Sequence, residues 1–144
     1  MHGDNSVKSR TLLVLAFWAA IGVACTSDAP LAAPIEFRRS GGIVGLDDLL
    51  TIDAKGYAQL TRRTGKPEFD LAPGDFARLT ALLRDANFKS IPEDSRRKHY
   101  LVPDEISYVI VYQGHTVKTS DTAIPEKLQP VIQMMNGILD AKSR

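Results

Sequence analysis

The sequence is poor in the residues that build cross-linked or metal-rich proteins. It has one cysteine and three histidines among 144 residues. This excludes a disulfide framework and an all-cysteine metal cluster, and it leaves few ligands for any other metal site. An excess of one charge is also missing, because 18 basic residues face 17 acidic ones. Nucleic-acid-binding domains carry a clustered excess of Lys and Arg, so nucleic acid is not an expected partner.

A hydrophobic run long enough to cross a bilayer is missing as well. Residues 11–24 form an uncharged, largely apolar segment of fourteen residues, whereas a transmembrane helix needs roughly 20. Lys8 and Arg10 precede this segment, and small residues end it. A positive start, a short apolar core and a small-residue end are typical of a secretory signal peptide. We therefore expect residues 1–24 to be a signal peptide that directs export.

Cys25 follows the apolar segment directly. The Gly-Val-Ala before it resembles the end of a bacterial lipobox, although Leu is more usual than Gly22 at the first of these positions. In a lipobox the cysteine is acylated and becomes the mature N-terminus. The resemblance implies a lipid anchor in the bilayer of the cell envelope, at the outer membrane in a Gram-negative cell. The alternative is ordinary signal cleavage near residues 29–33, which would leave no lipid.

Residues 25–34 are small and Pro-bearing, and we expect them to form a tether. Loss of residues 1–24 would remove Lys8, Arg10 and Asp4, so the 18 basic and 17 acidic residues would fall to 16 of each. The mature chain would then have no net charge to steer a partner. Residues 35–144 have the length of one ordinary domain.

Alternating apolar and polar residues predict strands in this domain. The expected strands are residues 35–39, 49–53, 57–63, 106–112 and 115–120, with 68–71 as a further short candidate. Short links such as Gln113-Gly114 imply antiparallel pairing. Residues 106–112 are apolar on both faces, which predicts a central strand.

Two amphipathic helices complete the prediction. Pro73 and Asp75 suit the start of a helix whose apolar stripe ends near Asn87. The second helix starts at Pro125, and Pro130 within it predicts a separate or kinked first turn. Both stripes must be buried on the sheet. The expected fold class is therefore α+β, an antiparallel sheet of four to five strands with two helices on one face (β-β-β-α-β-β-α).

No catalytic constellation is visible in the sequence. It contains no G-x-S-x-G for a nucleophile and no H-E-x-x-H for zinc. We expect the remaining candidate groups to be surface or hairpin-end histidines and solvated charges: His99, His115, Asp47–Asp48, Asp104–Glu105 and the basic run at 96–98. We therefore expect no enzyme activity, cofactor, metal site or small-molecule substrate.

The segment 40–46 is unusual because glycines bracket two branched apolar residues. Its members are Ser40, Gly41, Gly42, Ile43, Val44, Gly45 and Leu46. The segment is no phosphate cradle, since it joins two strands and has no Lys-Ser/Thr pair. In one interpretation Ile43 and Val44 fold back onto the sheet. In the other, the loop protrudes and offers both side chains to a partner protein.

Residues 35–46 resemble the opening of the emfourin family, protein inhibitors of thermolysin-like zinc metalloproteases such as protealysin. That opening is a strand followed by Arg/Ser-Gly-Gly, then an apolar residue, and then a pair made of a small residue and a glycine. Residues 71–79, 104–112 and 123–132 are similar to later parts of the family, so the resemblance covers most of residues 35–140. This chain departs from the family in having Ile43 where an aromatic residue is common, and in carrying an export leader.

The resemblance implies an inhibitor that binds a metalloprotease through residues 40–46, and the leader implies that this inhibitor is exported. A protease cleft accepts an extended strand together with a bulky apolar side chain in a pocket. Ile43 or Val44 would fill that pocket. The alternative, from a different class, is a non-catalytic cell-envelope lipoprotein that acts as a general binding or structural module.

Overall fold

The computed structural model describes residues 34–96 and 102–142. The strands are β1 (Ile35–Gly41), β2 (Leu46–Ile52), β3 (Tyr57–Thr61), β4 (Glu68–Asp70), β5 (Ile106–Tyr112) and β6 (His115–Ser120). The helices are α1 (Pro73–Asp85) and α2 (Gln129–Ala141), with short 3-10 turns η1 (Phe88–Ser90) and η2 (Glu126–Leu128).

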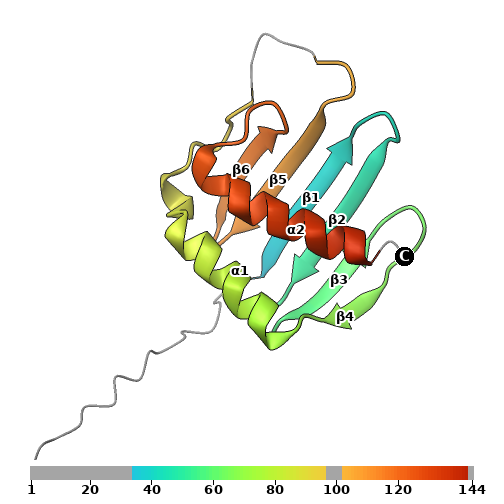
Figure 1. Cartoon of the computed structure of the whole chain (residues 1–144), viewed down its shortest axis with the longest axis vertical. Coiled ribbons are helices and arrows are strands. Elements are labelled where there is room, and N and C mark those ends of the chain that lie inside the picture. The colour runs from blue at the N-terminus through green and yellow to red at the C-terminus, as the bar shows by residue number, and fades with distance from the viewer. Residues whose placement is uncertain (1–33, 97–101, 143–144) are drawn as a thin grey trace, which may run out of the picture.

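The strands form one antiparallel sheet in the order β4-β3-β2-β1-β5-β6. Both helices cover the same face of this sheet (Figure 1). The predicted α+β class is confirmed. The sheet has six strands rather than four or five, because the short candidate segment pairs with β3 as the edge strand β4.

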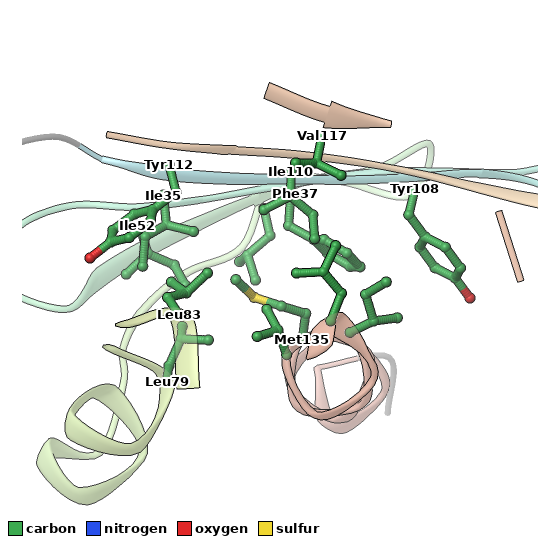
Figure 2. Close-up of a cluster of buried hydrophobic side chains, with 14 of the residues drawn as sticks. Ile35, Phe37, Ile52, Leu79, Leu83, Tyr108, Ile110, Tyr112, Val117 and Met135 are labelled. Carbon is green, nitrogen blue, oxygen red and sulfur yellow. The ribbon is translucent and has the colours of Figure 1, made fainter. Parts of the chain in front are cut away.

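The place of the strand at 106–112 differs from the prediction. β5 lies between β1 and β6, whereas β1 and β2 occupy the middle of the sheet. Tyr108, Ile110 and Tyr112 point toward the helices, while Val109 and Val111 lie on the open face and are only half-buried. The strand is apolar on both faces although only one face is covered by helices (Figures 1 and 2).

The core lies between the sheet and the two helices (Figure 2). Leu79 and Leu83 of α1 and Met135 of α2 are fully buried beneath Phe37 and Ile110. Each of these side chains comes from the apolar stripe or alternating face that the sequence predicts. Burial of this shared apolar surface holds the helices against the sheet.

α1 begins and ends close to the predicted positions, and the last helical stretch is divided as predicted. α1 starts at Pro73, and Asn87 adopts a left-handed conformation (φ 48°) just after the helix ends. The last helical stretch is divided, with η2 as a separate turn and Pro130 in the first turn of α2. A proline there lacks only an N–H that would have no partner within the helix.

Three loops gather at one end of the sheet, where the candidate functional site lies. They are the turn between β1 and β2, the segment before β5, and the segment after β6 (Figure 1). β1 begins at Ile35, at the end of the strand that is opposite to this turn. The seven residues of β1 separate the two ends by roughly 20 Å.

Candidate functional site

The glycine-rich segment is a tight hairpin turn that is shorter than predicted. Gly41 and Leu46 are the last paired residues of β1 and β2, so Ser40, Gly41 and Leu46 belong to the strands. The Gly45 N–H donates a hydrogen bond of 2.9 Å to the Gly42 carbonyl. Ile43 and Val44 therefore occupy the two central positions of a β-turn. We call residues 42–45 the tip.

The tip exposes its two apolar side chains to solvent. Ile43 is 85% exposed and Val44 is 77% exposed, the highest values among the exposed large hydrophobic residues of the described chain. The interpretation in which both side chains fold back onto the sheet is therefore wrong. They project because the turn lies beyond the last strand pair, where neither helix reaches. Exposed branched aliphatic residues side by side at a loop end are typical of contact surfaces.

The tip is held firmly at its base. The Gly42 N–H donates a hydrogen bond of 3.2 Å to the Glu105 carbonyl, in the segment that leads into β5. Gly41 adopts a φ of +98°, and a Cβ placed on it would lie 2.5 Å from that same carbonyl oxygen. Only glycine allows this close approach, so Gly41 lets the base of the tip pack directly against the segment before β5.

A charged cluster lies near the tip, between the sheet and α2. Arg39 donates hydrogen bonds to one oxygen of Asp48 from Nε (3.2 Å) and Nη2 (2.8 Å). Its Nη1 donates to Asn136 Oδ1 (3.2 Å) and Asp140 Oδ1 (3.1 Å) on α2. Arg62 Nε lies 3.4 Å from the second Asp48 oxygen. We call these five residues the arginine cluster.

The position of Asp48 corrects the prediction that Asp47–Asp48 are solvated loop charges. β2 starts earlier than predicted, so both residues lie in the strand. Asp47 faces solvent, where it pairs with Arg38, but the Asp48 side chain is only 8% exposed. Two arginines compensate the charge of this buried carboxylate, as buried ions require.

Arg39 keeps its positive charge in this cluster. Burial lowers the pKa of Arg39, but hydrogen bonds to Asp48 and Asp140 outweigh that effect and the net pKa is raised. A signal for this cluster was present in the sequence. Arg39 shares the alternating face of Ile35 and Phe37, just as Asp48 shares the face of Leu50 and Ile52.

The other candidate residues lie apart from the tip. His115 starts β6, where its Nε2 lies 2.9 Å from the Ile91 carbonyl and its ring packs edge-on against Phe88. This is a hairpin-end histidine, as predicted. Arg96 is paired with Asp94. The lipidation candidate Cys25, His99, and residues 97–98 of the basic run lie outside the described residues.

Asp104 and Glu105 lie beside the tip. Asp104 is exposed and has a left-handed backbone (φ 70°), a conformation that Asp tolerates better than most residues. Glu105 is partly buried, and its carboxylate accepts a hydrogen bond from the Thr122 hydroxyl. The pair is therefore not uniformly solvated, and Glu105 joins the segments before β5 and after β6.

A groove of about 460 Å³ lies beside α2 at the same end of the sheet. It is lined by Tyr108, Asp121, Thr122, Ala123, Ile124, Gln129, Ile132, Gln133 and Asn136. We call it the α2 groove. Sequence patterns give no sign of it, because its walls come from β5, the segment after β6 and one face of α2.

Two general kinds of feature are absent from the described residues. Within residues 34–96 and 102–142, no three His, Cys, Asp or Glu side chains are grouped so that they could hold a metal ion. Over the same residues, no helix combines the length and hydrophobicity needed to cross a membrane.

Comparison with known proteins adds no family to this description. No family model, curated protein or solved structure matches the chain. The resemblance to emfourins therefore stays a prediction from the residues themselves.

Proposed function

We propose that the protein is an exported, membrane-tethered inhibitor of a thermolysin-like zinc metalloprotease, and that the tip enters the substrate cleft of that protease. The observation that carries the proposal is the exposure of Ile43 and Val44 at the centre of a tight turn. These residues lie in the segment that resembles the emfourin opening.

The geometry suits inhibition by docking. Either tip residue offers a branched apolar side chain for a specificity pocket of the cleft. The turn is closed by its own hydrogen bond and tied to Glu105 before any partner binds. A pre-formed turn loses little conformational entropy on docking, so more of the contact energy contributes to affinity. The catalytic zinc in this proposal belongs to the protease.

The first prediction tests the tip directly. Ile43→Asp should weaken inhibition of thermolysin at least tenfold, because anchor residues cost about 2 kcal/mol or more when they are lost. The melting temperature should hardly change, since the Ile43 side chain is 85% exposed and contributes little to the core. Inhibition constants and thermal melts of the two proteins provide the measurement.

Tyr57→Ser is the matched control for this prediction. Tyr57 is also an exposed large hydrophobic residue (40%), but it begins β3, at the end of the sheet opposite the tip. Inhibition by this variant should equal that of the wild type. A wild-type protein that does not inhibit thermolysin-like proteases would contradict the proposed function and favour a general binding module of the cell envelope.

A further inference from the structure

The tip is too small to form a stable protein complex alone. Specific interfaces bury about 800 Å² on each partner, contributed by some 20–30 residues. The tip has four residues, of which two are glycine. If it docks in a protease, most of the contact area must come from surfaces that adjoin it.

The surface that adjoins the tip leads to the α2 groove. Gly42 is bonded to the Glu105 carbonyl, and the Glu105 carboxylate accepts a hydrogen bond from Thr122 in the groove wall. The Asp121 N–H donates a hydrogen bond of 3.0 Å to the Ile106 carbonyl. These contacts join the tip, the segment before β5 and the segment after β6 into one end of the molecule (Figure 1).

The lining of the α2 groove indicates what it binds. The side-chain amides of Gln129 and Gln133 offer both donors and acceptors, and Asp121 adds an acidic side chain. The described lining residues include no Lys, Arg or His, so the groove lacks the cations that phosphate or nucleotide ligands need. A peptide main chain presents one donor and one acceptor per residue, which matches such a mixed lining.

The floor of the α2 groove is fixed before binding. Asn136 Nδ2 lies 3.5 Å from the Tyr108 hydroxyl, while Asn136 Oδ1 accepts the hydrogen bond from Arg39. The arginine cluster therefore sets the orientation of the Asn136 amide. Ile124, which is partly buried, adds apolar surface beside it.

We propose that an extended main-chain segment of the inhibited protease lies in the α2 groove while the tip occupies the substrate cleft. This inference rests on the proposed function. It extends the contact surface from residues 42–45 across Glu105 and Thr122 to α2. Gln129 and Gln133 would then contact the partner.

The test fills the groove without disturbing the core. Gln133 and Gln129 are exposed on α2 and line the groove. Gln133→Arg should weaken inhibition of thermolysin at least tenfold and leave the melting temperature unchanged. Gln129→Arg, as a second variant on the same wall, should act in the same direction. Gln59→Arg makes the same substitution at an exposed position on the helix-free face of β3, and it should inhibit like the wild type.

The outcomes separate the two proposals. If both groove variants remain folded and inhibit like the wild type while Ile43→Asp does not, the groove is outside the interface and the inference is wrong, although the proposed function stands. If Gln59→Arg weakens inhibition as much as Gln133→Arg, the effect is one of added charge and the inference is again overturned. A wild-type protein without inhibitory activity would overturn both proposals.

Discussion

At the scale of single residues, the glycines and the branched residues of the tip have different roles. Gly42 and Gly45 adopt positive φ values of 70° and 60°, while Ile43 and Val44 do not. A branched residue in the left-handed region would be strained. The flanking glycines therefore reverse the chain, and the two apolar residues keep ordinary backbone conformations at the exposed turn.

Gly41 is the residue whose replacement should disturb the tip most. Gly41→Ala should lower the free energy of unfolding by about 2 kcal/mol or more, because a Cβ combines a strained backbone with a contact to a carbonyl. The added Cβ would lie 2.5 Å from the Glu105 carbonyl oxygen. Urea unfolding of the variant and the wild type measures the loss.

Gly114 provides the comparison for this second prediction. It also has a positive φ (75°), but a Cβ on it would meet nothing within 4 Å. Gly114→Ala should therefore lose only the backbone contribution, about 1 kcal/mol. Equal losses at the two positions would show that the Glu105 contact does not matter.

At the scale of the elements, the arginine cluster joins three strands to one helix. Arg39, Asp48 and Arg62 come from β1, β2 and the residue after β3, and Asn136 and Asp140 come from α2. The Arg62 Nη2 also donates to the Leu139 carbonyl near the end of α2 (3.2 Å). The cluster thus holds the strands that carry the tip against the helix that forms one wall of the α2 groove.

Removing the central carboxylate should reveal the importance of this link. Asp48→Ala should lower the free energy of unfolding by about 3–5 kcal/mol, because it leaves buried Arg39 without its main counter-charge. Chemical denaturation with circular dichroism measures the change.

The neighbouring residue Asp47 is a close control. It pairs with Arg38 at 2.9 Å, but both side chains are more than half exposed. Asp47→Ala should therefore cost less than about 1 kcal/mol. If the two alanine variants were equally stable, the arginine cluster would not be the link described here.

At the scale of the whole molecule, the tip and the start of the domain lie at opposite ends of β1. A chain anchored upstream of Ile35 would hold that end near the membrane and leave the tip on the far side (Figure 1). The geometry is therefore compatible with a membrane tether and a soluble protease partner at the same time.

The proposed lipid anchor leads to the last prediction. Cys25→Ser should release the protein from membranes or block its processing, because acylation requires the cysteine thiol. Fractionation of cells that express the variant and the wild type measures the change. A wild-type protein that is soluble and starts near Pro34 would contradict lipidation and support ordinary signal cleavage.

The sequence by itself determined most of the fold. Period-two alternation identified the strands, the helical stripes identified α1 and α2, and proline and glycine marked where both kinds of element end. These signals are local, because they arise from backbone geometry and from the burial of one face. The strand order is not local, which explains why β5 was wrongly expected at the centre of the sheet.

The candidate site was predictable only in part. The glycine pattern identified the turn, but only the tertiary structure decided that Ile43 and Val44 are exposed, because that depends on how far the helices reach. The burial of Asp48 likewise depends on two arginines that converge on it, Arg39 of β1 and Arg62 just after β3. The α2 groove arises where segments distant in sequence meet. Packing of distant segments, rather than local pattern, sets such features.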